Sequence, residues 1–256
     1  MLLVLDIGNT NISVGVYDED IAADARFSST DRTADEAGLL LESLLCSRGI
    51  PLNAIDGAIF CCVVPNLEVA WRGAIKKYFR FDPVIVSDKL DLGIKIDTDF
   101  PGEVGADRLA NAVGAAAKYG SPVIAVDLGT AINIDVVSRD YSYIGGALAP
   151  GLMTSVRTLF SGTAKLPQVA LEAPPRAIGR NTINAIQSGI IYGYTGLVDE
   201  LVKRIVEELG EEAFVVATGG HADTLAAQSK MIKAVDYRLT LDGLRIIYKR
   251  NSKCYA

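Results

Sequence analysis

An aspartate–glycine turn placed directly after a buried strand occurs twice in this chain, about half its length apart. The first copy reads LLVLDIGNT from Leu2 to Thr10, and the second reads VIAVDLGT from Val123 to Thr130. Apolar runs of this length bounded by a turn signal are typical of buried strands. Alternating apolar residues follow each copy and predict a second strand that folds back as a hairpin. The repeat therefore indicates two similar lobes.

The carboxylate that ends the first strand, Asp6, needs a partner, because burying an unpaired charge is costly. One interpretation is a turn aspartate that caps its own backbone. The other is a loop that faces phosphate, in which Gly8 lets backbone N–H groups approach an anion and Asp6 holds a hydrated Mg²⁺. Asn9 and Thr10 would then donate hydrogen bonds to the phosphate. The second copy of the motif favours the phosphate loop.

A third glycine turn, formed by Thr218, Gly219 and Gly220, follows a predicted strand at 214–218. It is either an ordinary strand-to-helix turn or a place where bare backbone lies flat against an adenosine. The chain contains no GxxxxGK[ST] sequence, which excludes the P-loop class of nucleotide binders. Three glycine turns at strand ends resemble the arrangement in the superfamily of actin, hexokinase and Hsp70.

Predicted strands alternate with predicted helices along the whole chain, which is typical of the α/β class. We expect two actin-like (ribonuclease H-like) lobes, each with a mixed sheet flanked by helices, and a nucleotide cleft between them. A Gly-Ser-Pro break at 120–122 predicts lobes at residues 1–119 and 120–256. The segment 93–108 and the glycine-rich stretch 144–151 are expected to be irregular. The glycines of the predicted helix 182–208 are candidate kink points.

Composition excludes several classes of protein. Half of the 256 residues are apolar and 22% are charged, which excludes a disordered chain. A net charge of −6 argues against nucleic acid or an anionic membrane as a partner. The apolar runs are strand-sized and no signal peptide is recognisable. Four cysteines without a CxxC pair, and one histidine, argue against a zinc site. We expect a cytoplasmic protein with reduced thiols.

The segment EVGADR, residues 103–108, places Asp107 and Arg108 at the start of a predicted helix. N–H groups and the helix dipole stabilise anions there, so we expect Asp107 to stay ionised and to accept a proton from a substrate hydroxyl. Arg108 would bind a substrate carboxylate through a bidentate pair. The alternative is an N-terminal aspartate beside a surface arginine, and spacing alone leaves both open.

Eight motifs together resemble the type III pantothenate kinase family, in order from residue 1 to about 246. They are DIGNTN at 6–11, PxEVGADR at 101–108, DxGTA at 127–131, GGxxxPG at 145–151, TAxLP at 163–167, TxxAIxSG at 182–189, TGG at 218–220 and LTLxGL at 239–244. The resemblance implies an actin-like kinase that uses ATP to phosphorylate the primary hydroxyl of pantothenate, the first step of coenzyme A synthesis.

The resemblance also implies roles for single residues. The ATP phosphate loop would consist of Asp6, Ile7, Gly8, Asn9, Thr10, Asn11, Ile12 and Ser13. Asp6 would lie near the Mg²⁺ that accompanies ATP, and Thr130 would contact ATP, as would the turn at Gly219 and Gly220. Asp127 would bind a monovalent cation, K⁺ or NH₄⁺.

Pantothenate binding is implied for Gly105, Ala106, Asp107 and Arg108, with Asp107 as the proton acceptor. Thr182 would also contact pantothenate, and Thr163 would lie nearby. Members of the family are homodimers that enclose the substrate near the subunit interface. The expected partners are therefore pantothenate, ATP and a second copy of the chain.

The sequence departs from the family pattern in two places. Ile132 and Asn133 stand where two threonines are usual, and Thr98 stands where an aromatic residue, typically tyrosine, is expected. An active kinase is the favoured interpretation, because the acidic residues and Arg108 are retained. One alternative is a non-catalytic family member that binds a ligand or a partner protein. Another is a sugar or acyl-phosphate kinase on the same fold, which rests on analogy alone.

Overall fold

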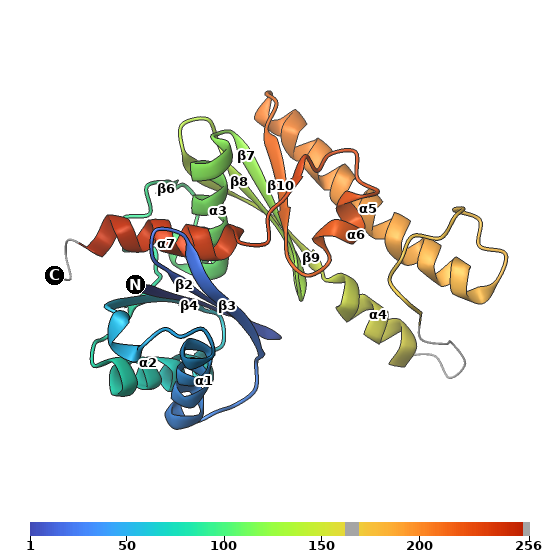
Figure 1. The fold of residues 1–256 in the computed structure, drawn as a ribbon. Coiled ribbons are helices and arrows are strands. Elements are labelled where there is room, and N and C mark those ends of the chain that lie inside the picture. The colour runs from blue at the N-terminus through green and yellow to red at the C-terminus, as the bar shows by residue number, and fades with distance from the viewer. Residues whose placement is uncertain (162–168, 253–256) are drawn as a thin grey trace. The chain divides into compact units, whose positions relative to one another are not determined.

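A computed structural model describes residues 1–161 and 169–252, which divide into two units (Figure 1). Unit 1 contains Met1–Ala117 and the C-terminal segment from Leu239, and unit 2 contains Lys118–Arg238. Each unit has its own sheet and its own buried apolar core.

The sheet of unit 1 has the strand order β3-β2-β1-β4-β5. Its strands are β1 (Leu2–Ile7), β2 (Asn11–Tyr17), β3 (Ile21–Ser28), β4 (Gly57–Cys62) and β5 (Val84–Ile85). The first three strands pair antiparallel, whereas β1, β4 and β5 pair parallel. The predicted hairpin is confirmed. The third strand, β3, was not predicted, because its sequence IAADARFS has few β-branched residues and its position depends on pairing with β2.

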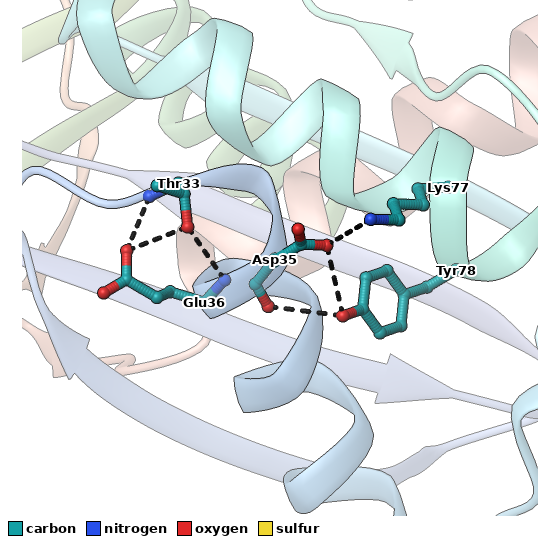
Figure 2. A network of polar contacts seen from close by, with 5 residues as sticks. All are labelled: Thr33, Asp35, Glu36, Lys77 and Tyr78. Atoms are coloured by element: carbon teal, nitrogen blue, oxygen red, sulfur yellow. Dashed lines mark hydrogen bonds and ion pairs between the residues drawn. The ribbon is translucent and has the colours of Figure 1, made fainter.

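Two helices, α1 (Ala34–Ser47) and α2 (Pro65–Phe79), pack against each other in unit 1. A capping box opens α1: the Glu36 N–H donates to Thr33 Oγ1 at 3.2 Å, and the Thr33 N–H donates to Glu36 Oε2 at 2.7 Å (Figure 2). Lys77 of α2 forms an ion pair with Asp35 of α1 at 2.6 Å. Trp71 of α2 is fully buried in the core of unit 1.

The C-terminal helix α7 (Leu239–Asn251) belongs to unit 1, so the predicted lobe 120–256 is wrong for its last helix. It packs on β1 and β4 and crosses α3 (Ala106–Tyr119). A Cβ added to Gly243 would lie 1.9 Å from the carbonyl oxygen of Ala110. The small residues of α3 allow this close approach of the two backbones. A division of the sequence at a single point cannot account for a last helix that packs on the first sheet of the chain.

Short elements complete unit 1. They are the 3-10 helices η1 (Leu52–Ala54) and η2 (Pro101–Glu103) and the two-residue strand β6 (Lys95–Ile96). The last two lie within the stretch 93–108, which was expected to be irregular.

The sheet of unit 2 repeats the pattern of unit 1, with the order β11-β10-β7-β8-β9. Its strands are β7 (Val123–Leu128), β8 (Ala131–Val137), β9 (Ser142–Pro150), β10 (Phe214–Thr218) and β11 (Ala234–Val235). Strands β7, β8 and β9 pair antiparallel, and β7, β10 and β11 pair parallel. The prediction of a glycine-rich turn at 144–151 is wrong, because this stretch forms most of β9. Gly146 is required there, since its Cβ would lie 1.7 Å from the Ile134 carbonyl oxygen.

Three helices belong to unit 2: α4 (Leu152–Ser161), α5 (Thr182–Leu209) and α6 (Ala222–Ala226). The Asn181 side chain caps α5 by accepting from the Asn184 N–H at 2.8 Å. The helix is continuous past its three glycines, so a break there is not observed. Among the described residues, no helix has the length and apolar character needed to cross a membrane. The fold is thus mixed α/β, with two mixed sheets flanked by helices.

Candidate active site

The first aspartate turn is held in shape by backbone hydrogen bonds. The Gly8 N–H donates to the carbonyl oxygen of Asn11 at 3.0 Å, which closes the turn between β1 and β2. Ser29, just after β3, donates its hydroxyl to the Gly8 carbonyl and its N–H to the Thr10 carbonyl at 3.0 Å. Asn9, Thr10 and Asn11 are exposed, so their polar groups are accessible to a ligand.

Asp6 is the second-to-last residue of β1, which lies between β2 and β4 in the sheet. Its register partners are Ser13 on β2 and Cys61 on β4. The Cys61 thiol donates a hydrogen bond to Asp6 Oδ1 at 3.3 Å. The pKa of Asp6 is raised to about 6, mainly by burial and to a smaller extent by the negative charge of Asp107. The hydrogen bond from Cys61 and the charge of Arg26 act in the opposite direction.

Asp107 occupies the first turn of α3, where the sequence predicted it. Its Oδ1 accepts the Arg108 N–H at 2.8 Å. A Cβ added to Gly105 would lie only 2.6 Å from that same oxygen, so glycine leaves the room in which the carboxylate folds back. Burial raises the pKa of Asp107 and outweighs the hydrogen bond and charge of Arg108. The expected stabilisation of the ionised form by the helix start is present but is not the larger effect.

The second aspartate turn, in unit 2, is also closed by the N–H of its glycine but is one residue shorter. The Gly129 N–H donates to the Ala131 carbonyl at 3.1 Å. The register partners of Asp127 are Asn133 on β8 and Thr218 on β10. Directly after Thr218, a Cβ on Gly219 would lie 2.7 Å from Asp127 Oδ1. The structure therefore brings the second and third glycine turns together.

Thr130 is fixed by two groups from the start of α4. Its carbonyl oxygen accepts the Gly151 N–H at 3.1 Å and the Thr154 hydroxyl at 2.9 Å. A Cβ on Gly151 would lie 2.2 Å from this oxygen, which explains the glycine of the Pro-Gly pair. Sequence reasoning did not find Thr154. The sequence shows only that a threonine stands in the first turn of the helix that follows Pro150 and Gly151.

The departures from the family pattern differ in their surroundings. Ile132 is 1% exposed and packs in the apolar core of unit 2, so it faces away from Asp127. Asn133 is the residue opposite Asp127 and keeps a polar amide there. The Thr98 hydroxyl oxygen is buried and has no hydrogen-bond partner among the described residues. Of the departures, Asn133 is the one that lies beside a predicted site residue.

The remaining predicted site residues lie in different parts of the chain. Thr182 is exposed at the start of α5 in unit 2, whereas Asp107 and Arg108 belong to unit 1. Gly220 follows Gly219 in the third glycine turn. Thr163 lies outside the described residues. Within unit 1, the structure brings Asp6, Asp107 and Cys61 close enough for their charges and hydrogen bonds to interact.

The sequence model of type III pantothenate kinase matches residues 2–204 of the chain. The chain belongs to this family. A type III pantothenate kinase of Roseiflexus sp. (strain RS-1) is 48% identical over 253 residues, which cover 98% of this chain and 99% of the relative. The type III pantothenate kinase of Paramagnetospirillum magneticum is also 48% identical, covering 98% of both chains.

Solved structures place the type III pantothenate kinase fold of this chain among actin-like ATPases and sugar kinases. MreB 5 of Spiroplasma citri aligns with a TM-score of 0.57 at 10% identity, covering 99% of this chain and 97% of the other. The polyphosphate/ATP-glucomannokinase of an Arthrobacter species aligns with a TM-score of 0.52 at 14% identity, covering 98% of each. At such low identity these likenesses concern the fold alone, and they confirm the predicted fold class.

Proposed function

We propose that this protein is an active kinase that transfers the γ-phosphoryl group of ATP to the primary hydroxyl of pantothenate. The observation that carries this function is the pairing of Asp107 with Asp6 in unit 1. The two residues are far apart in the sequence, yet the fold brings the Asp107 carboxylate close enough for its charge to raise the pKa of Asp6. The full-length likeness to pantothenate kinases favours this activity over a non-catalytic binding role.

Asp107 is the proposed proton acceptor. It is held by the Arg108 N–H, and burial raises its pKa toward the working pH, which makes it a better base than an ordinary aspartate. Removing the hydroxyl proton as the phosphoryl group arrives contributes about 10²–10⁴-fold to such reactions. Arg108 would bind the pantothenate carboxylate, because a guanidinium can form a bidentate pair with it. Gly105 and Ala106 would line the same substrate site, and we propose Thr182 as a further contact of pantothenate.

The surroundings of Asp6 fit a Mg²⁺ ion that arrives with ATP. Its carboxylate is desolvated beside a second carboxylate, and a divalent cation would relieve both effects. The described residues contain no cluster of three or more acidic, histidine or cysteine side chains that could hold a metal. Mg²⁺ usually binds one or two carboxylates together with substrate phosphates and water, and it neutralises phosphate charge. Asp6 is the proposed protein ligand, and the segment 7–13, in which residues 9–11 are exposed, would bind the phosphates.

Nucleotide contacts are also proposed for residues of unit 2. Thr130 is fixed by Gly151 and Thr154, and we assign it a contact with ATP. Gly219 and Gly220 would lie against the adenosine. Asp127 offers a carboxylate oxygen, the type of ligand that a hard cation such as K⁺ or NH₄⁺ prefers.

A homodimer is part of the proposal. Ile144 and Leu148, 41% and 64% exposed, lie on the same face of β9 and offer apolar surface for a second copy. We also propose that the enzyme works in the cytoplasm without a nucleic-acid or membrane partner, which agrees with its net charge of −6.

Coupled measurement of ADP release tests the function. We expect turnover with pantothenate, Mg²⁺ and ATP, and a higher rate with K⁺ or NH₄⁺ than with Na⁺. A panel of sugars and carboxylic acids as acceptors should give no comparable rate. Absence of turnover under all these conditions would contradict the proposal. Tight calorimetric binding of pantothenate without turnover would favour the non-catalytic alternative.

A further inference from the structure

Cys61 is a buried thiol that stands beside the carboxylate of Asp6. The two residues are register partners on the adjacent parallel strands β4 and β1. The Cys61 side chain is fully buried, and its sulfur lies 3.3 Å from Asp6 Oδ1. An ionised carboxylate only accepts hydrogen bonds, so the thiol is the donor.

The neighbouring thiol, Cys62, has a different environment. Its side chain points to the opposite face of the sheet, where it packs against the core formed with α1 and α2. Its thiol donates to the carbonyl oxygen of Val64 at 3.2 Å, and the charge of Asp6 is the smallest of the effects that shift its pKa. The chain thus carries two adjacent cysteines on one strand, of which one contacts the proposed Mg²⁺ ligand.

The second lobe repeats the arrangement. Asp127 on β7 has Thr218 as its register partner on the parallel strand β10, as Asp6 on β1 has Cys61 on β4. In each unit, therefore, a small side chain with a hydrogen on its heteroatom stands beside the aspartate at the end of the strand. The recurrence of this partner position agrees with a hydrogen-bond donor beside the aspartate.

We propose that Cys61 is a positioning residue for the Asp6 carboxylate. Its S–H group fixes the rotation of the Asp6 carboxylate about the Cβ–Cγ bond, so that the carboxylate is oriented before Mg²⁺ and ATP bind. Since the strand holds the Cys61 backbone in a parallel ladder, the donor cannot follow the carboxylate if it turns. The proposal rests on the proposed function only through the role of Asp6 as a Mg²⁺ ligand.

The first test compares three variants, Cys61→Ala, Cys61→Ser and Cys62→Ala. Loss of a hydrogen bond to a charged group predicts that Cys61→Ala raises the KM for MgATP at least about tenfold. The KM for pantothenate should stay within about twofold of the wild-type value, because the hydrogen bond that is lost is the one to the proposed Mg²⁺ ligand. Cys61→Ser keeps a donor and should recover most of the lost affinity. Cys62→Ala removes a sulfur from the same strand and should leave the KM for MgATP unchanged.

Two further measurements do not depend on turnover. Calorimetric titration with Mg²⁺ and a non-hydrolysable ATP analogue should reproduce the order of the variants. In the infrared spectrum, the S–H stretching band that is absent from Cys61→Ser belongs to Cys61. That band should lie at the low frequency of a hydrogen-bonded thiol in the wild type and should move upward in Asp6→Ala.

The outcomes separate this inference from the proposed function. If the wild type does not phosphorylate pantothenate, the proposed function fails, while the infrared band and the titration still decide the role of Cys61. If Cys61→Ala binds the nucleotide as tightly as the wild type, or if the S–H band does not respond to Asp6→Ala, the inference is overturned. Equal effects of Cys61→Ala and Cys62→Ala would also overturn it, because they would show only a loss of packing.

Discussion

Gly243 of α7 lies directly against the backbone of Ala110 of α3, so that a Cβ on the glycine would stand 1.9 Å from the alanine carbonyl oxygen. A second glycine on the other helix, Gly114, is in the same position relative to Leu239, whose carbonyl oxygen would lie 2.4 Å from an added Cβ. The two helices therefore cross with their backbones in contact. This contact fastens the C-terminal helix to the helix that begins with Asp107.

The substitution Gly243→Ala should destabilise the protein by about 1–3 kcal/mol, the usual cost of overpacking, because backbone atoms must move apart. The matched control is Gly189→Ala in α5, where an added Cβ meets no atom within 4 Å. That change should be neutral or stabilising by up to about 1 kcal/mol, since alanine favours helices. Urea unfolding of both variants measures the difference, and equal stabilities would contradict the crossing.

Removal of the proposed base should abolish most of the activity. We expect Asp107→Asn to lower kcat at least about 100-fold, because the amide cannot accept the hydroxyl proton. The control is Asp88→Asn, which neutralises an exposed carboxylate of the same unit. A kcat for Asp107→Asn close to that of the control would rule out Asp107 as the base.

Gly105→Ala should reduce activity while leaving the fold intact. The new Cβ would lie 2.6 Å from Asp107 Oδ1, and the short side chain would have to swing away from the Arg108 N–H. A loss of about 10–100-fold in kcat/KM is expected, in keeping with a misplaced catalytic group. Gly102→Ala, in the same segment, adds a Cβ at an ordinary 3.8 Å from Asp88 and should have little effect. Thermal unfolding shows whether either variant is misfolded.

The stability of the ligand-free protein should fall as the pH rises from about 4 to 6. Asp6 has a pKa of about 6 when folded against an ordinary value of 3.8, so in this range the native state binds more protons than the unfolded state. Proton linkage then lowers the free energy of unfolding with rising pH, by an amount on the order of 3 kcal/mol for this residue. The Asp107 carboxyl contributes with the same sign, because its pKa is also raised.

The variant Asp6→Asn isolates this effect. It should be more stable than the wild type at pH 8, and the difference should vanish near pH 4, while its activity is lost. Denaturant unfolding at several pH values measures the difference between the two proteins. A variant that is less stable than the wild type at pH 8 would contradict this prediction. It would show that other groups stabilise the negative charge of Asp6 in the ligand-free protein.

The capping box of α1 should contribute to stability but not to catalysis. Thr33→Ala removes the side chain that accepts the Glu36 N–H and should cost about 1 kcal/mol (Figure 2). Lys77→Met breaks the exposed ion pair with Asp35 and should change stability little, because solvent screens such pairs. Chemical unfolding with a parallel ADP-release assay checks both effects. A loss of activity without a loss of stability in Thr33→Ala would contradict this assignment.

Several features of the fold could be predicted from the residues alone. The apolar runs before Asp6 and Asp127 predicted two equivalent strand–turn–strand units, because a short apolar run bounded by a turn signal is typical of a buried strand. The capping box at Thr33 and the small residues of α3 were likewise local signals. The glycines inside β9 misled the prediction, since glycine is common in turns and its use for close strand approach depends on the partner strand.

Residues that act through neighbours could not be found in the same way. Nothing in the sequence around Cys61, Ser29 or Thr154 distinguishes them from other small residues of the chain. Their importance comes from hydrogen bonds to Asp6, Gly8 and Thr130, and each of these bonds joins different elements.

The sequence by itself thus determined the two aspartate turns, the Asp107–Arg108 pair and the family to which the chain belongs. These depend on residue order over short distances. Only the tertiary structure decided that α7 returns to the first unit, that Gly219 lies beside Asp127, and that Asp6 stands next to both Cys61 and Asp107. The physical reason is that strand register and helix crossing bring together residues far apart in the chain, and burial then sets the charge of each carboxylate.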